Sequence, residues 1–282
     1  MDKWRKKAYN KLNTFLKVTQ MNLREGLKNT KRVVFKVGTY SLTYPNGRLN
    51  INKIDVLVRV IADLKNRGMD AVLVSSGAIG VGVGKLGLGE KPKDMPGKQA
   101  AAAVGQCELM YLYDKLFSEY GHVTGQVLLT KDAIEHDDRR INAHNTFMRL
   151  IEMGVVPIVN ENDAVSTEEI EFGDNDTLSA YVASLCDADL LVILTDIDGL
   201  YNKNPREYPD AQLISQVEEI TDDILALGGS AGSSRGTGGM ITKLYAARIA
   251  SEAGIKTIVC SADEPKDIYR IFDEEEFGTI FR

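Results

Sequence analysis

Two lysines in this sequence stand where an ammonium group can bind phosphate. Lys36 interrupts the apolar run 32–37, which predicts a buried β-strand, and burying an ammonium group without a partner is costly. It is either a strand-end lysine that reaches solvent or a lysine directed at a phosphate. Lys243 ends the run 236–243, which passes from a glycine loop into a helix. Backbone N–H groups in such a loop bind phosphate oxygens, although the spacing is not that of a Walker A motif.

A polar stretch at 172–178, Phe-Gly-Asp-Asn-Asp-Thr-Leu, precedes a helical pattern. Apolar residues then recur at the spacing of one helix face, at Leu178, Tyr181, Val182 and Leu185. The helix is therefore expected to begin between Asp174 and Asp176. One Asp or Asn suffices for an N-cap, so the three polar residues indicate either a strong cap in a polar loop or a ligand site. In a ligand site, the free N–H groups of the helix start receive an anion while an acid orders nearby cations.

Polar residues and glycines also follow four apolar runs that predict strands. In an open parallel sheet, ligands bind beyond the carboxyl ends of the strands, so these residues are expected to share one edge. A single case would be an ordinary turn, whereas four together predict a binding site. Among the residues of these four groups, the Ser76 hydroxyl and the Gly77 N–H are candidate ligands for a substrate or for developing charge. The four groups are Lys36, Gly38 and Thr39; Ser75, Ser76 and Gly77; Asn160, Glu161, Asn162 and Asp163; and Thr195, Asp196, Asp198 and Gly199.

The elements that must position these residues alternate between strands and helices. Such a βαβα order predicts an α/β fold with a mostly parallel sheet and helices on both faces. Pro157 cannot donate to a ladder, so its strand is predicted to be an edge strand or to begin at Ile158. Strands are predicted at 32–37, 71–74, 122–129, 155–160, 190–194 and 256–260, and helices at 54 to about 68, 99–117, 142–153 and 244–253.

The glycine-rich segment 77–89 contains a G-x-G-x-x-G sequence, from Gly82 to Gly87. A dinucleotide-binding fingerprint must directly follow a strand and open a helix. Here the predicted strand ends several residues earlier, and Pro92 and Pro96 follow closely. We therefore interpret the segment as a mobile loop beside the substrate pocket.

Composition excludes several classes of protein. The 282 residues are 44% hydrophobic, enough for a full core, and their formal net charge of −6 disfavours a nucleic-acid surface. Three cysteines that are far apart fit neither a metal spacing nor a disulfide framework, which indicates a reducing, cytoplasmic location. No apolar run reaches the ~20 residues that a membrane helix needs. The three histidines form no catalytic set.

Residues 1–30 are basic and form a separate segment of the sequence. Trp4, Ala8, Leu12 and Phe15 are spaced to line one helix face. Asn22 and Glu25 are spaced as a variant capping box for a second short helix. We expect a helical extension that lies on the body of the protein or on a neighbouring subunit. A transit peptide and initiation at Met21 are the minor alternatives.

Nine short segments together are similar to one known family. They are Val-Phe-Lys-Val-Gly-Thr (34–39), Ser-Ser-Gly-Ala-Ile (75–79), Val-Gly-Gln (104–106), Gln-Val-Leu-Leu-Thr (126–130), Val-Asn-Glu-Asn-Asp-Ala-Val (159–165), Gly-Asp-Asn-Asp (173–176), Leu-Thr-Asp (194–196), Gly-Leu-Tyr (199–201) and Gly-Thr-Gly-Gly-Met (236–240). On these segments the chain is identified as a member of the amino acid kinase family. The fifth and sixth segments, in this order, resemble the members that phosphorylate glutamate.

The resemblance implies a three-layer αβα sandwich in which residues 31–282 form one kinase domain. Its N-terminal half would bind the amino acid and its C-terminal half ATP. The implied reaction is ATP-dependent phosphorylation of the L-glutamate γ-carboxylate, the first step of proline biosynthesis, with ATP and Mg²⁺ as cofactors. Proline is the implied feedback inhibitor, and a dimer or tetramer the implied assembly. Protein ligands of the metal cannot be assigned.

The resemblance also implies a role for individual residues. Lys36 and Lys243 would bind the transferring phosphoryl group, and Asp176 would hold the two lysines in place. Gly77 would serve the reaction through its N–H group. Glutamate would be bound by Ser76, Asp163 and Asn175. ATP would be bound by Lys36, Thr195, Asp196, Thr237, Gly238, Gly239, Met240, Ile241, Thr242 and Lys243.

Two features depart from the family pattern. Many members carry a C-terminal PUA domain, which is not expected here because the sequence ends at Arg282. Tyr40 stands where many members have a small residue, so the shape of the first loop is open. The competing hypotheses are a kinase of the same fold that acts on N-acetylglutamate, aspartate, carbamate or a nucleoside monophosphate, and a catalytically silent sensor of ATP or proline. A hydride-transfer dehydrogenase is a distant third.

Overall fold

The computed structural model describes residues 22–44, 48–165, 175–229 and 239–282. Eight strands in these ranges form one sheet. They are β1 (Arg32–Val37), β2 (Asp70–Ser75), β3 (Thr124–Leu129), β4 (Val156–Glu161), β5 (Leu190–Thr195), β6 (Gln216–Val217), β7 (Lys256–Ser261) and β8 (Thr279–Phe281). Their order is β3-β4-β2-β1-β5-β7-β8-β6, and all neighbours pair in parallel except β7 and β8.

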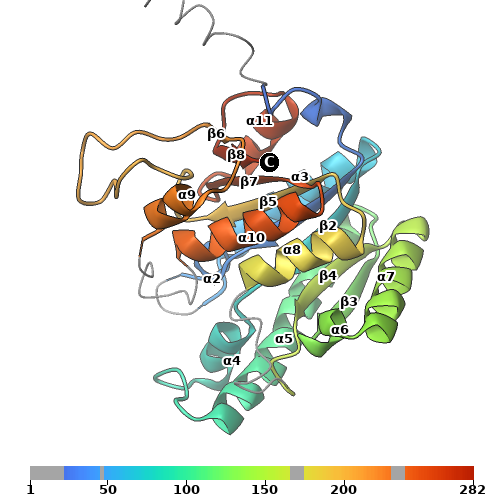
Figure 1. Cartoon of the computed structure of the whole chain (residues 1–282). Coiled ribbons are helices and arrows are strands. Elements are labelled where there is room, and N and C mark those ends of the chain that lie inside the picture. The colour runs from blue at the N-terminus through green and yellow to red at the C-terminus, as the bar shows by residue number, and fades with distance from the viewer. Residues whose placement is uncertain (1–21, 45–47, 166–174, 230–238) are drawn as a thin grey trace, which may run out of the picture.

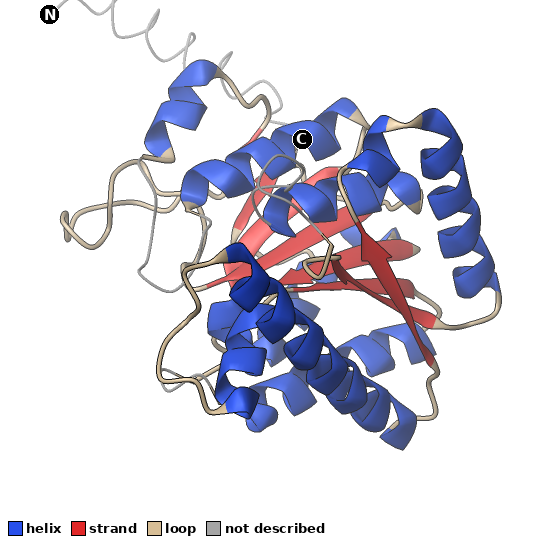
Figure 2. Ribbon diagram, turned by 90° about the horizontal axis from the view of Figure 1, so that it is seen from below, coloured by secondary structure: helices blue, strands red, loops and turns tan. Residues whose placement is uncertain are grey.

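Helices cover both faces of this sheet (Figures 1 and 2). The helices of the described ranges are η1 (Leu27–Asn29), α2 (Thr39–Leu42), α3 (Ile51–Asn66), α4 (Ala78–Leu86), α5 (Met95–Glu119), α6 (Asp132–Glu135), α7 (Asp137–Glu152), α8 (Asn175–Leu185), α9 (Asp222–Leu227), α10 (Met240–Glu252), η2 (Pro265–Asp267) and α11 (Ile268–Phe272). One buried cluster joins α3, α5 and α11 to the sheet, and a second joins α7, α8 and α10 to its other face. The predicted three-layer α/β architecture is therefore confirmed.

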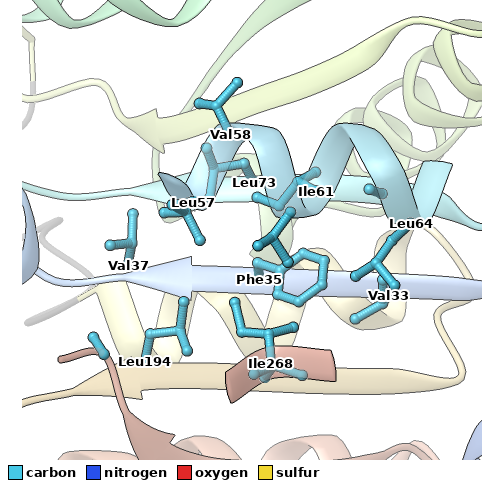
Figure 3. Close-up of a cluster of buried hydrophobic side chains, with 14 of the residues drawn as sticks. Val33, Phe35, Val37, Leu57, Val58, Ile61, Leu64, Leu73, Leu194 and Ile268 are labelled. Atoms are coloured by element: carbon cyan, nitrogen blue, oxygen red, sulfur yellow. The ribbon is translucent and has the colours of Figure 1, made fainter. Parts of the chain in front are cut away.

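β1 is a central strand, with β2 on one side and β5 on the other. Side chains alternate between the two faces of a strand. Val33, Phe35 and Val37 accordingly pack in the cluster of α3 (Figure 3). Val34 packs in the cluster of α8 and α10. Lys36 is two residues from Val34, so its side chain points to the same face of the sheet. This face is covered by α8 and α10, which Figure 1 shows side by side.

The glycine-rich segment 77–89 is not a loop, and that prediction was wrong. Its residues Ala78–Leu86 form helix α4, which lies very close to α5. A Cβ on Gly82 would lie 1.8 Å from the carbonyl oxygen of Ala101, and one on Gly105 would lie 1.8 Å from that of Ala78. Because glycine has no side chain, the two helices can pack this closely. The packing stabilises a helix in a segment whose glycine content would otherwise disfavour one.

Replacing Gly105 by alanine is expected to destabilise the protein, although alanine is the better helix former. The new methyl group would overlap the backbone of α4, and such overpacking typically costs about 1–3 kcal/mol. Urea unfolding should show this loss for Gly105→Ala and almost none for Gly89→Ala, because a Cβ on Gly89 meets nothing within 4 Å. Equal stabilities of the two variants would contradict the close packing.

Strand β4 is not an edge strand, as its proline had suggested, because it lies between β3 and β2. Pro157 pairs with Gly125 of β3. The N–H of the preceding Val156 points to β3, where it donates to the carbonyl of Val123. Position 157 thus faces β2, whose ladder with β4 begins only at Ile158. The missing N–H of the proline therefore removes no bond of the sheet.

Residues 22–30 lie on the body of the protein. Leu23 and Leu27 belong to the cluster that contains α3. The buried Arg24 donates hydrogen bonds to the carbonyls of Ser215, Phe277 and Gly278. The expected second helix is a turn followed by the 3-10 helix η1. The Asn22 side chain accepts from Arg24 N, and Glu25 N donates to the Asn22 backbone carbonyl instead of to its side chain. The predicted helix face at Trp4–Phe15 lies outside the described residues.

The remaining predicted strands and helices are found with shifted ends. α10 begins four residues earlier than expected, at Met240, and α7 five residues earlier, at Asp137. None of the helices in the described ranges combines the length and apolar character needed to cross a membrane.

Candidate active site

Asp176 lies between the two lysines that the sequence singled out. It stands in the first turn of α8 and is only 1% exposed. Its Oδ1 is 2.6 Å from Lys36 Nζ, and its Oδ2 is 3.0 Å from Lys243 Nζ. The lysines, from β1 and α10, are 7% and 6% exposed. The expectation that one carboxylate joins two lysines distant in sequence agrees with this geometry, and the reading of Lys36 as a solvent-exposed strand-end lysine does not.

The carboxyl group of Asp176 is held in its ionised form. Burial alone would raise its pKa, but the ammonium groups of Lys36 and Lys243 outweigh burial and hold the pKa of Asp176 well below its usual range. A hydrogen bond of 2.8 Å from Thr242 Oγ1 acts in the same direction. Two cations and one anion leave an excess of one positive charge. The cluster therefore holds together without a ligand and still attracts an anion.

Two helices begin at this cluster. α8 begins at Asn175, as predicted, and α10 begins at Met240 after Gly239 as its N-cap. Thr242 and Lys243 lie in the first turn of α10, and both approach the Gly239 carbonyl, at 2.8 and 3.4 Å. The first N–H groups of a helix lack intrahelical partners and carry partial positive charge. The start of α10 thus adds an anion-binding feature beside Lys243.

A second polar cluster surrounds Asn175, the residue before Asp176. The Asn175 amide nitrogen lies 2.9 Å from the Ser75 carbonyl, 3.0 Å from Ser76 Oγ and 2.9 Å from Asn160 Oδ1. These acceptors come from the ends of β2 and β4, which confirms that the polar residues after these strands share one edge. Asn160 in turn accepts from Glu161 N and donates to Gln106 of α5.

The other residues expected to bind the amino acid flank this cluster. Gly77, the N-cap of α4, has a left-handed φ of 94°, a conformation that favours glycine. A Cβ on it would lie 3.4 Å from the side chain of Thr39, so the loops after β1 and β2 are neighbours. Asp163 lies in the turn that follows β4.

The residues expected to bind the nucleotide lie at the end of β5 and the start of α10. Thr195, the last residue of β5, donates to Asp196 Oδ1 at 3.2 Å, and Arg206 donates to Asp196 Oδ2 at 3.2 Å. Gly239 is buried, and Met240, Ile241, Thr242 and Lys243 form the first turn of α10. Thr237 and Gly238, also expected to bind ATP, lie outside the described residues, as do Gly173 and Asp174.

The part of the chain that the structure describes contains no metal-binding cluster. No group of three or more His, Cys, Asp or Glu side chains there is arranged to hold an ion. Asp176, the most buried acid of the site, already binds two lysines and Thr242. Mg²⁺ is commonly held by one or two carboxylates together with phosphates and water, so these residues do not assign its ligands.

The sequence model of the amino acid kinase family matches residues 31–261. The chain belongs to the amino acid kinase family. Among curated relatives in this family, glutamate 5-kinase of Clostridium perfringens is 52% identical over 263 residues, which are 92% of this chain and 98% of the relative. Glutamate 5-kinase of Clostridium acetobutylicum is 53% identical over 93% of this chain and 98% of its own length. As a member of this family, the chain is a kinase.

Solved structures of amino acid kinase fold proteins share the architecture. Carbamate kinase from Giardia lamblia, bound to AMP-PNP, aligns with a TM-score of 0.64 and 18% identity, over 90% of this chain and 99% of that one. Isopentenyl phosphate kinase from T. acidophilum aligns with a TM-score of 0.62 and 20% identity, over 89% and 100%. At these identities the alignments show the fold alone.

Several polar partners of the site in this family member were not predicted from the sequence. Gln106 was part of a recognised motif without a role, Asn160 was expected at the binding edge of the sheet without a role of its own, and Thr242 was expected to contact the nucleotide rather than Asp176. Arg206, and Tyr113 of α5, whose hydroxyl lies 2.9 Å from Ser75 Oγ, could not be singled out from the sequence. Each lies in a segment whose local pattern is that of an ordinary loop or helix. Their roles depend on contacts between residues far apart in the chain.

Proposed function

We propose that this kinase transfers the γ-phosphoryl group of ATP to the γ-carboxylate of L-glutamate and forms L-glutamyl 5-phosphate, the first step of proline biosynthesis. The observation that carries the proposal is the adjacency of Asn175 and Asp176 at the start of α8. Asp176 holds the two lysines, and Asn175 is held in the polar cluster at the ends of β2 and β4. A cationic site for phosphate and a polar site for an amino acid thus meet at one helix start.

The choice of glutamate rests on the named relatives. More than half of the aligned residues are identical to those of clostridial glutamate 5-kinases over nearly the whole length of those enzymes. The acceptor chemistry agrees with the residues of the site. A glutamate carboxylate, with a pKa near ~4.3, is ionised at neutral pH and attacks phosphorus without a general base. One carboxylate oxygen bonds to phosphorus as the bond to the ADP oxygen breaks, and no proton moves.

Catalysis of such a transfer is mainly positioning and charge stabilisation. Lys36 and Lys243 neutralise charge on the transferring phosphoryl group, and Asp176 fixes their ammonium groups before the substrates bind. Ser76, Asp163 and Asn175 bind glutamate, and the Gly77 N–H faces the developing charge. Thr195, Asp196 and the segment 237–243, including Thr237 and Gly238, hold ATP. Mg²⁺ enters as part of the MgATP substrate.

A hydroxamate assay tests the proposal directly, because hydroxylamine traps an acyl phosphate. We expect hydroxamate and ADP in equal amounts with ATP, Mg²⁺ and free L-glutamate, and little with N-acetylglutamate or L-aspartate. Faster turnover of either of those acids would overturn the choice of substrate. Calorimetric binding of ATP without turnover of any acid would instead favour a silent sensor.

Two further properties are proposed from the family resemblance. L-proline acts as a feedback inhibitor at or near the glutamate site, and the enzyme is a cytoplasmic homodimer or homotetramer. Addition of L-proline to the hydroxamate assay should raise the apparent KM for glutamate. Sedimentation of the intact chain should give two or four times the monomer mass of 31.1 kDa.

Replacing Asn175 by alanine is expected to raise the KM for glutamate about tenfold and to change kcat less. The substitution removes one amide that contacts Ser75, Ser76 and Asn160, and each lost hydrogen bond is worth about 1 kcal/mol. Initial rates at saturating ATP measure the effect. Asn142→Ala, an exposed asparagine of α7, is the control. An unchanged KM for glutamate in Asn175→Ala would remove Asn175 from the glutamate site.

A further inference from the structure

Helix α5 supports the polar cluster around Asn175 at two points. Gln106 and Tyr113 are seven residues apart, so they lie two turns apart on the same face of the helix. Gln106 accepts a hydrogen bond of 2.8 Å from Asn160. Tyr113 OH lies 2.9 Å from Ser75 Oγ. Asn160 and Ser75 each supply an oxygen to the Asn175 amide nitrogen. Two of the acceptors around Asn175 therefore belong to residues that α5 holds.

The contact between Tyr113 and Ser75 is fully enclosed. Tyr113 is 1% exposed and is among the largest completely buried side chains, and Ser75 is also buried. Burial raises the pKa of Tyr113 above its ordinary value, so the phenol stays protonated at working pH. Ser75 is the last residue of β2, and Ser76 and Gly77 follow it. A rotation of the Ser75 backbone would move its carbonyl oxygen away from Asn175.

The helix that carries Tyr113 is itself fixed relative to the site. Gly105, beside Gln106, packs against the Ala78 carbonyl, and Ala78 directly follows Gly77. The contact leaves no space for even one added methyl group. α5 is thus a rigid support for the polar cluster. A hydrogen bond from such a support fixes a backbone group more accurately than one from a loop would.

We propose that Tyr113 is a positioning residue for the amino-acid substrate: through Ser75 Oγ it sets the corner Ser75–Gly77 and thereby the place of the Asn175 amide. This inference rests on the proposed function, because it takes the cluster around Asn175 as the glutamate site. It assigns Tyr113 no contact with the substrate and no part in binding ATP. Its effect is therefore confined to glutamate binding.

The test compares Tyr113→Phe with Tyr111→Phe, which removes a hydroxyl from a 65% exposed tyrosine of the same helix. We expect Tyr113→Phe to raise the KM for glutamate about five- to tenfold, the effect of about one hydrogen bond. Its KM for ATP and its kcat should stay within about twofold of the wild type. Tyr111→Phe should leave all three constants unchanged.

A double variant separates positioning from mere stability. Ser75→Ala and Ser75→Ala/Tyr113→Phe should show the same rise in KM as Tyr113→Phe, because all three lack the same bond. The double variant leaves no buried hydroxyl unpaired, so its thermal unfolding should return toward the wild type while its KM does not. A KM for glutamate that returns toward the wild type together with the melting temperature would overturn the inference. It would also be overturned if the KM effects of Ser75→Ala and Tyr113→Phe added in the double variant, or if Tyr113→Phe and Tyr111→Phe had equal KM values.

The wild-type chain distinguishes this inference from the proposed function. Turnover of glutamate by the wild type, with no selective KM change in Tyr113→Phe, would overturn the positioning role alone. A wild type without glutamate-dependent turnover would overturn the proposed function and this inference with it.

Discussion

Replacing Lys36 by methionine is expected to lower kcat by about two to three orders of magnitude, the loss seen when one preorganised donor is removed from a transition state. Methionine keeps the length and apolar stem of the side chain, so the core of β1 is preserved. Asp176 keeps its contacts with Lys243 and Thr242, which should preserve the start of α8. The variant therefore lacks one charge at the proposed phosphoryl site, while the rest of the site is expected to stay in place.

The measurement is kcat at saturating glutamate and ATP, with the circular dichroism spectrum and thermal unfolding as tests of folding. Lys115→Met is the matched control, because Lys115 is an exposed lysine on α5 away from the cluster. It should keep wild-type kcat. A folded Lys36→Met variant that turns over at nearly the wild-type rate would show that Lys36 does not act on the transferring group.

The strands that carry the site are predictable from the sequence for a simple reason. A parallel strand buried on both faces is a continuous apolar run, and 32–37 and 190–194 are such runs. Their polar ends then identify one edge of the sheet, because all parallel strands end on the same side. Lys36 stands out because a charge in such a run needs a partner. Its partner Asp176 stands out as an acid at a helix start, where an acid is favoured.

Other parts of the fold depend on contacts that a local pattern does not contain. The segment 77–89 has the composition of a loop, and only its contact with α5 makes its glycines compatible with a helix. Strand β6 has two residues and β8 three, too few to show alternation. Their pairing at the sheet edge comes from the end of the chain folding back on β7. The prediction from Pro157 was wrong because the effect of a proline on a strand depends on which neighbouring strand its nitrogen faces.

The same distinction holds within the site. Residues proposed to bind directly, such as Lys36 and Asn175, lie near the end of a strand or at the start of a helix, and their position alone makes them candidates. The residues that hold these side chains in place are not marked by their position in the sequence. Tyr113 lies in the last third of a long helix, beside apolar residues, and its sequence context is that of a core aromatic. Only the distance from its hydroxyl to Ser75 gives it a role.

Asp176→Asn is expected to be the most damaging single substitution for both stability and turnover. Asparagine has nearly the same shape, but it leaves Lys36 and Lys243 without a counter-ion at positions that are 7% and 6% exposed. Breaking a buried ion pair by removing one partner typically costs about 3–5 kcal/mol. The two ammonium groups would also repel each other and lose their fixed positions, so kcat should fall by about two orders of magnitude or more.

The pH dependence of unfolding tests this account of Asp176 without a substrate. The pKa of Asp176 is lower in the folded protein than its unfolded value of about 4. Its contribution is therefore fully present above about pH 4 and is lost as the pH falls toward the lower folded value. Chemical unfolding should show a constant difference in the free energy of unfolding between wild type and Asp176→Asn from about pH 5 to 8. This difference should narrow below about pH 4.

The control is Glu119→Gln, which replaces an exposed acid of α5 and should show no comparable gap in the free energy of unfolding. A gap of the same size at pH 3, or none at pH 7, would mean that the carboxylate does not hold the two lysines.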